Sequence, residues 1–441
     1  GASNTAVGTE ALKANTTASY NSAFGHHSLI TNTTGYNNVG IGSFSLRYNT
    51  EGFENVAVGY SALEANTTGD YNVGIGRSAL QTQTTANHNI AIGYQAGQDI
   101  TTGQQNTAVG SQALKDGTTA AQNVAIGGFS LDALTTGAFN VAVGNLALGA
   151  ATTSSNNTAV GYAALTANTT GNNNVAVGVE ALTTNTIGAQ NVAVGNSALK
   201  DCTTGTLNTA IGHAALDDLT IGNYNTAIGR LALSAVTTQE HNTAVGMNAL
   251  NATTASYNTA VGSEALTTNG NGTKNVAVGR SALRASTSAS NNVAVGDEAL
   301  KTNTTGHRNV AIGARAAELN TTGSSNVAIG YEVLEDNTTG ANNIAIGDSA
   351  MELNTTGSNN TAIGLSALLS NTTGQYNTAV GSTALDALTT ASKTTAVGYG
   401  ALGATTTGYD NTAVGHGSIG ANTTGHKHVA VGAYSLDANT T

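Results

Sequence analysis

Threonine pairs, and the asparagines that precede them, recur at regular spacing and could carry chemistry. Asn-x-Thr is the acceptor sequence for N-linked glycans in secreted proteins. The same place in other repeats holds Leu134, Leu219 or Leu388, which indicates a turn residue that leans inward. Both interpretations stay open for the candidate glycan acceptors, which are Asn15, Asn32, Asn66, Asn168, Asn303, Asn320, Asn337, Asn354, Asn371, Asn422 and Asn439.

The threonine pairs, such as Thr67-Thr68 and Thr338-Thr339, also make ice binding one interpretation of the sequence, because ice-binding solenoids display stacked threonine arrays. Adjacent residues of an extended segment point to opposite faces, so each pair offers one outward threonine and not a flat array of two columns. Ordinary turn chemistry is the simpler interpretation.

Histidines and carboxylates do not recur at the spacing of a metal or catalytic site. His416, His426 and His428 fall close together and His26 adjoins His27, but no carboxylate or cysteine recurs with them at ligand spacing. The carboxylates never recur as the pair that a glycan-cleaving enzyme needs. We therefore expect no catalytic residue, no metal site, no cofactor and no enzyme activity.

Tyrosines such as Tyr60, Tyr71 and Tyr376 lie at variable places beside the turns. Exposed aromatic rings could stack on the glycans of a host surface. Their scattered placement favours incidental surface positions.

One glycine recurs every 17 residues from Gly8 to Gly246 and again from Gly262 to Gly432, which gives 26 repeats. Self-similarity at a short fixed period is typical of a solenoid, whose units bury their apolar sides against their neighbours. We expect one continuous repeat domain over residues 1–441, uncapped at both ends and part of a longer fibre. The predicted turn glycines include Gly8, Gly59, Gly110, Gly161, Gly212, Gly262, Gly313, Gly364 and Gly415.

We number each repeat so that this glycine is position 17. Positions 14 and 16 are mostly Val, Ile or Thr around a small residue, which predicts a short strand. Ala and Leu at positions 3 and 4 predict a second strand that faces the first across a thin core. The predicted fold is an all-β parallel β-solenoid (β-roll) of 26 stacked rungs, each with two short strands and two turns.

Position 13 is asparagine in all but two repeats, where Thr394 and His428 replace it. Stacked rungs would place these side chains in register, so we expect an asparagine ladder that includes Asn4, Asn55, Asn106, Asn157, Asn208, Asn258, Asn309, Asn360 and Asn411. One repeat lacks a residue near positions 251–253, in the turn before Thr253-Thr254. A deletion in a turn should leave the strand register intact.

Charge and composition exclude several partners. Charged residues make up 9% of the chain, the net charge is −11, and no basic cluster occurs, so we expect no nucleic-acid partner. No segment approaches ~20 apolar residues, so we expect no membrane insertion. Cys202 is the only cysteine; it could crosslink chains if exposed, but a buried thiol is the simpler expectation.

Each rung offers little apolar area, which favours lateral association of chains. Alanines at positions 3 and 15 would allow the chains to approach closely. We expect a homotrimer, with continuation from end to end as a further form of self-association.

The element Asn-x-Ala-Val/Ile-Gly, as in residues 55–59 and 326–330, resembles the repeat in the heads of trimeric autotransporter adhesins and in phage or large-virus tail fibres. The resemblance covers the whole chain and implies a trimeric β-roll that works in attachment or as a fibre shaft. This chain differs in its longer unit, and we expect no neck, coiled-coil stalk or anchor of the adhesin kind within residues 1–441.

These observations predict a non-enzymatic structural fibre or shaft of an extracellular appendage, on a cell surface or virion, that gives reach, stiffness and multivalent adhesion. The alternative is a repetitive surface that binds a ligand directly, either a host glycan or ice through the threonine turns, with glycans at the Asn-x-Thr turns.

Overall fold

The computed structural model of the protein describes residues 1–440. Each repeat contributes one strand of three residues, and the chain forms two compact units, an N-terminal unit (Gly1–Asn223) and a C-terminal unit (Tyr224–Thr441). Among the described residues there is no helix long and apolar enough to cross a membrane.

The N-terminal unit holds the strands β1 (Thr5–Val7), β2 (Ser22–Phe24), β3 (Val39–Ile41), β4 (Val56–Val58), β5 (Val73–Ile75), β6 (Ile90–Ile92), β7 (Thr107–Val109), β8 (Val124–Ile126), β9 (Val141–Val143), β10 (Thr158–Val160), β11 (Val175–Val177), β12 (Val192–Val194) and β13 (Thr209–Ile211).

The C-terminal unit holds the strands β14 (Thr226–Ile228), β15 (Thr243–Val245), β16 (Thr259–Val261), β17 (Val276–Val278), β18 (Val293–Val295), β19 (Val310–Ile312), β20 (Val327–Ile329), β21 (Ile344–Ile346), β22 (Thr361–Ile363), β23 (Thr378–Val380), β24 (Thr395–Val397), β25 (Thr412–Val414) and β26 (Val429–Val431).

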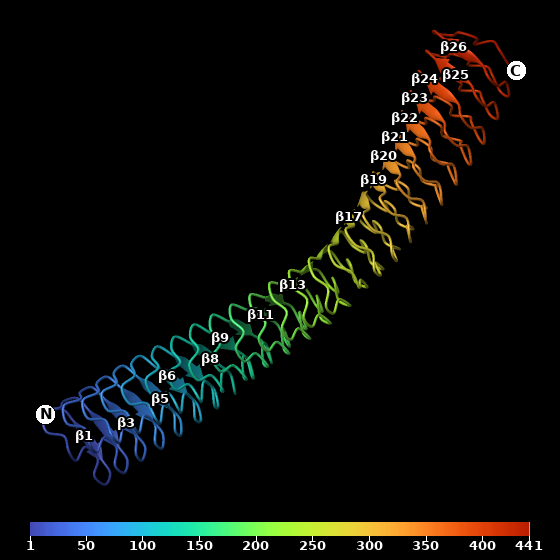
Figure 1. Ribbon diagram of the computed structural model, residues 1–441. Coiled ribbons are helices and arrows are strands. Elements are labelled where there is room, and N and C mark those ends of the chain that lie inside the picture. Colours follow the sequence, from blue (N-terminus) through green and yellow to red (C-terminus); the bar gives the residue numbers. More distant parts are fainter. Residues whose placement is uncertain (441) are drawn as a thin grey trace. The chain divides into compact units, whose positions relative to one another are not determined.

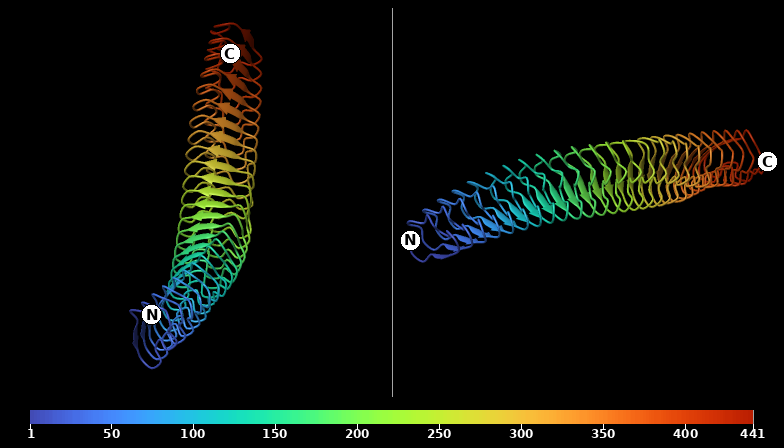
Figure 2. Two further views of the ribbon diagram at one scale, coloured as in Figure 1. Left: turned by 90° about the vertical axis from the view of Figure 1, so that its left-hand side faces the viewer. Right: turned by 90° about the horizontal axis from the view of Figure 1, so that it is seen from below.

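Within each unit, every strand pairs in parallel with the strand of the next repeat. In the pair β4–β5, Val56 lies opposite Val73 and Val58 lies opposite Ile75. Figure 1 shows one arrow for each turn of the ribbon, and in both views of Figure 2 the arrows of neighbouring rungs lie side by side. The predicted parallel β-solenoid of stacked rungs is confirmed.

Each rung has one strand, where the sequence predicted two. The Ala-Leu segment forms turns, because the residues at positions 2 and 4 have left-handed backbones, as at Ser61 (φ 54°) and Leu63 (φ 50°). A left-handed backbone costs a residue other than glycine roughly 1–2 kcal/mol. The side chain of Leu63 is fully buried, which contributes about 1.5–3 kcal/mol and offsets that cost. The amide of Leu63 still donates to the carbonyl of Ala79 in the next rung (2.9 Å).

The strand faces the opposite way from the prediction. The central residue at position 15 is the buried one, as for Ala57, while Val56 and Val58 on either side point outward and are half-buried. The period of two was right, but its phase was wrong. The small residue packs against the leucine column: a Cβ added to Gly74 at position 15 would lie 3.2 Å from Cγ of Leu63. The alanines at positions 3 and 15 therefore lie inside the rung, and they cannot provide a close approach between chains.

The short repeat lacks position 9. Thr254 takes the place of the first threonine of the pair, since its amide and hydroxyl both donate to the carbonyl of Gly270 at 2.8 Å. Thr253 takes the place of the asparagine, and its hydroxyl accepts a bond from Nδ2 of Asn269 (3.1 Å). The missing residue thus falls after the threonine pair, between Thr254 and Ala255, and not before the pair as predicted. The strand register across this rung is intact, as expected, because β15 pairs with β16 in line.

Candidate functional surfaces

The recurring glycines form a column in which neighbouring rungs touch. All of them have φ between +125° and +145°, a backbone conformation that side chains disfavour. A Cβ added to Gly59 would lie 2.5 Å from the carbonyl oxygen of Gly76 in the next rung. Glycine is therefore required at position 17 both by the backbone angle and by the contact with the next rung.

The predicted asparagine ladder at position 13 is present and buried. The amide N–H of Asn55 donates to Oδ1 of Asn38 in the preceding rung (3.0 Å). The side-chain Nδ2 of Asn55 donates to the carbonyl of Gly69 in the following rung (2.8 Å). Each ladder asparagine thus bonds to both neighbouring rungs, and it satisfies polar groups that would otherwise be buried without partners.

A second asparagine ladder lies at position 7, where the sequence had left glycan acceptors open. Nδ2 of Asn66 donates to Oδ1 of Asn49 (2.8 Å) and to the carbonyl of Gly69 (2.9 Å). A glycan would be joined to this nitrogen, which is a buried donor in the folded chain. The acceptor assignment is therefore wrong for the folded protein at the fully buried sites, which are Asn32, Asn66, Asn168, Asn303, Asn320, Asn337, Asn354, Asn371 and Asn422. The two remaining sites, Asn15 and Asn439, lie in the terminal rungs and are half-buried.

The sheet presents two continuous columns of side chains to the outside. We call positions 14 and 16 of β1–β26 the outer face. Position 16 is Val, Ile or Phe in every strand, position 14 is Val, Ile, Thr or Ser, and neither column contains a charged residue. Most isoleucines at position 16 are exposed, for example Ile41 at 42% and Ile126 at 40%. Sequence reasoning missed this face because Val-Ala-Val reads equally well with the valines inward.

The threonine pair at positions 8 and 9 splits into two roles. The first hydroxyl is used internally, as when Thr338 donates to the carbonyl of Thr355 in the next rung (3.0 Å). The second threonine is exposed, as at Thr339, and it recurs in most rungs, although Glu51, Ile187, Ile221, Asn271 and Ser288 replace it in others. A single exposed threonine is found in many pairs, as at Thr338-Thr339, whereas both threonines are exposed at Thr118-Thr119 and Thr237-Thr238.

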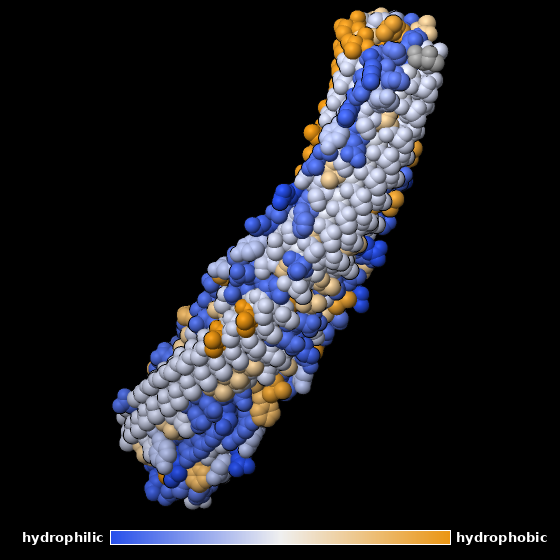
Figure 3. All heavy atoms as spheres, turned by 45° about the vertical axis from the view of Figure 1, so that its right-hand side comes forward, coloured by the Kyte–Doolittle hydropathy of each residue, from blue (hydrophilic) through white to orange (hydrophobic). Residues whose placement is uncertain are grey.

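Several histidines stack on tyrosines of neighbouring rungs. The ring of His88 lies 5.0 Å from that of Tyr71, at an interplanar angle of 4°. His241 lies between Tyr224 and Tyr257, at 4.8 and 5.0 Å. These ring faces contact one another, so they are not free to stack on a sugar. On the side seen in Figure 3, hydrophobic atoms form small separate groups on a pale and hydrophilic surface.

The histidines that lie close together in the sequence do not converge on one point in the structure. His26 and His27 stack on each other at 3.7 Å, and His416 stacks on Tyr399. His428 lies beside Nδ2 of Asn439, at 3.2 Å. Within residues 1–440, the one group of potential metal ligands that comes together is made of glutamates instead.

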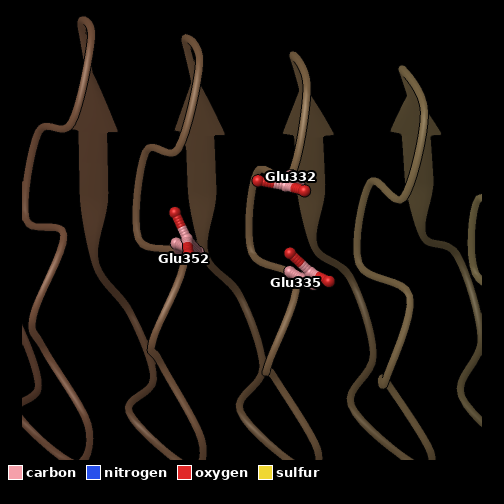
Figure 4. Close-up of side chains that lie close together, drawn as sticks. All are labelled: Glu332, Glu335 and Glu352. Atoms are coloured by element: carbon pink, nitrogen blue, oxygen red, sulfur yellow. The ribbon is translucent and has the colours of Figure 1, made fainter.

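That group consists of Glu332, Glu335 and Glu352, on two neighbouring rungs (Figure 4). One ligand oxygen from each lies within 4.8 Å of the others. Arg315 neutralises two of the three carboxylates, with its guanidinium nitrogens 2.6 Å from Glu332 and 3.2 Å from Glu335. Burial nevertheless raises the pKa of Glu335 above its ordinary value. The arrangement is an ion-pair ladder across rungs, which no spacing in the sequence singled out.

Cys202 occupies position 7 and is fully buried. Burial raises the pKa of its thiol to about 11. A thiolate is the form that reacts, so this thiol is inert at neutral pH. The expectation of a buried thiol is confirmed, and the folded chain cannot use Cys202 as a crosslink.

The described residues enclose no pocket. No family model and no curated protein matches the chain. The features that remain as candidate functional surfaces are the outer face and the exposed threonine column.

Proposed function

We propose that the protein is a non-enzymatic structural shaft of an extracellular appendage or a viral tail fibre. The repetitive β-solenoid is consistent with a structural, fibre-like shaft. Stiffness would come from bonds that recur at the same positions in every rung, namely the strand pairs, both asparagine ladders and the threonine hydroxyls. The resemblance to adhesin heads and tail fibres supports the location on a cell surface or virion.

We propose further that three chains associate laterally through the outer face. In each unit, 13 strands spaced ~4.8 Å apart, with two columns ~7 Å apart, give a strip on the order of 400 Å². This matches the largest apolar patch on a typical monomer, about 300–600 Å², and each unit carries one. Removing the strip from water would add the apolar burial that a thin rung of one leucine and a few alanines lacks.

The mass in solution tests this proposal. Sedimentation velocity should give three times 43.7 kDa for the intact chain. Glutamate in the outer face, as Val160→Glu, Val177→Glu and Val194→Glu together, should shift the mass to that of one chain, because three carboxylates would be buried at each level.

The matched control places glutamate at position 1 of the rungs that follow these strands, as Tyr162→Glu, Val179→Glu and Asn196→Glu, where the side chains are exposed. This variant should keep the mass of the native assembly. A native chain that sediments as a single copy, or a control that dissociates as readily, would contradict lateral association through this face.

The exposed threonine column supports a second candidate, direct binding of a repetitive ligand such as ice or a host glycan. Within the part of the chain that the structure describes, the hydroxyls of Thr322, Thr339 and Thr356 make no hydrogen bond, so they are free to bind. Ice-recrystallisation and glycan-array measurements on the intact chain test this candidate, and no activity in either would remove it.

A further inference from the structure

The two columns of the outer face differ in how the residue type varies from rung to rung. Position 16 is Val, Ile or Phe, so it is apolar at every rung. Position 14 changes between threonine and valine or isoleucine along the chain. Within the outer face, only position 14 changes between polar and apolar residues, so only this column can set a hydroxyl of one chain against a methyl group of another.

In the C-terminal unit, position 14 forms blocks. Threonine occupies β14–β16, valine or isoleucine occupies β17–β21, threonine occupies β22–β25, and β26 has valine. These side chains are mostly half-buried. The hydroxyls of Thr361, Thr378, Thr395 and Thr412 have no hydrogen-bond partner within the described chain.

We propose that the threonine pattern at position 14 sets the axial register of the laterally associated chains, which lie parallel and without stagger. The inference rests on the proposed lateral association and specifies its geometry. In this arrangement, each threonine meets the same threonine of the other copies. A hydroxyl both donates and accepts, so three of them at one level can close a ring of hydrogen bonds.

A slip of one rung sets threonine against valine or isoleucine at each block boundary, namely β16/β17, β21/β22 and β25/β26. A hydroxyl buried against methyl groups loses its water and gains no partner. Single polar residues fix the register of coiled coils by the same physics. The unslipped arrangement is the one in which every threonine is paired.

The N-terminal unit uses a different spacing. Thr107, Thr158 and Thr209 recur every third strand at β7, β10 and β13, with valines between them. A slip of three rungs would pair Thr107 with Thr158 and Thr158 with Thr209. The same slip breaks the longer blocks of the C-terminal unit, and one chain carries both patterns. The two units together exclude slips that either one alone would tolerate.

Disulfide crosslinking tests the register. Two full-length variants, Val293→Cys and Val327→Cys, place a thiol at position 14 in β18 and β20, two rungs apart. The two chains carry tags of different mass, assemble together and are oxidised mildly; Cys202 is buried and does not interfere. We expect disulfides between identical positions and none between residues 293 and 327.

A second pair of chains carries valine at every polar residue of the column. The replaced residues are Thr5, Ser22, Thr107, Thr158, Thr209, Thr226, Thr243, Thr259, Thr361, Thr378, Thr395 and Thr412. Valine is native at this position in many rungs, so the chain should fold, which circular dichroism checks. Crosslinks between residues 293 and 327 should now appear, because the column no longer distinguishes rungs.

The matched control makes Thr→Val changes in the exposed turn column, as at Thr305, Thr322, Thr339 and Thr356, and it should keep only identical-position crosslinks. Mixed crosslinks in the native column, no crosslinks in it, or unchanged crosslinks in the all-valine column would each overturn the register inference while the assembled mass stays. A single-chain mass would overturn the lateral association itself, and the register inference with it.

Discussion

At the scale of single residues, the fold depends on backbone positions where one atom decides what fits. Position 17 accepts no Cβ, since the carbonyl of the next rung occupies that space. Position 4 accepts leucine in a left-handed backbone, since burial of the leucine side chain offsets the cost of that backbone conformation. The backbone preference of the residue therefore decides which residue occurs at position 17, whereas burial of the side chain overrides that preference at position 4.

We expect Gly195→Val to destabilise the protein by ~3 kcal/mol or more, because valine at φ +135° is strained and its Cβ would lie 2.5 Å from the carbonyl of Gly212. The neighbouring change Asn196→Val is the control, since the preceding rung already carries valine there, at Val179. Denaturant unfolding should show a large loss for the first change and almost none for the second. Equal losses would mean that the glycine contact between rungs carries no special weight.

Asp386 is a carboxylate in an unfavourable place. Burial raises its pKa above the ordinary value of 3.8, and its Oδ1 has no hydrogen-bond partner. The folded state therefore favours the protonated form of Asp386. The contribution of this protonated carboxyl to the free energy of unfolding is complete below pH 3.8, and it is lost as the pH rises through the folded-state pKa. Asp386→Asn should raise the stability at pH 7, and the gain should vanish below pH 3.8.

Unfolding curves of native protein and variant over pH 3 to 8 measure this effect. The exposed Asp348→Asn is the control and should give a small, nearly constant difference. A gain for Asp386→Asn that persists in acid would show that burial of its charge is not the cause.

At the scale of the rung, residues at distant positions compensate for one another. Gly40 replaces the usual alanine at position 15, and a Cβ there would lie 2.6 Å from Oγ of Ser28 and 3.1 Å from Oγ of Ser45. Those serines replace the usual alanine at position 3, and they bond to each other at 2.9 Å. Around Gly40, the missing methyl group on the strand thus leaves room for the two hydroxyls of the turns.

This exchange predicts a change of sign. Gly40→Ala should destabilise the native chain by about 1–3 kcal/mol through overpacking. In a chain that carries Ser28→Ala and Ser45→Ala, the same change restores the common alanine pair and should stabilise by roughly 0.5–1 kcal/mol. A thermodynamic cycle from unfolding free energies measures the coupling, and a coupling near zero would contradict the packing described for Gly40.

The sequence was sufficient for the elements that follow from period and turn chemistry. The glycine column, the parallel stacking and the ladder at position 13 follow from residues that have one favourable role. The phase of the strand could not be predicted, because valine is stable on either side of a short strand. The left-handed turn at Leu63 could not be predicted either, since leucine gives no local signal for it. The asparagine ladder at position 7 could not be predicted, because leucine and cysteine occur at the same buried position in other rungs.

At the scale of the whole molecule, the two units have the same kind of surface and little charge to separate copies. Their outer faces carry no charged residue, and the ion pairs recorded in the C-terminal unit lie at other positions of the rung. Association of such chains is governed by apolar area, so it should depend on protein concentration and only weakly on salt.

We therefore expect the melting temperature to rise with protein concentration for the native chain, because association stabilises the folded state by mass action. The chain with Val160→Glu, Val177→Glu and Val194→Glu should melt at a temperature independent of concentration. Scanning calorimetry over a hundredfold range of concentration checks both. A native chain whose melting point ignores concentration would contradict an assembly held by the outer face.

The repeat that lacks position 9 bears on how the number of repeats in the gene can change. Backbone hydrogen bonds join the same atoms at successive rungs, so duplication or loss of a complete repeat in the DNA preserves this bonding pattern at the junction. The one departure from the 17-residue period in this sequence falls at the exposed turn. Recombination between repeats would thus supply solenoids of many lengths that keep the same backbone contacts between one rung and the next.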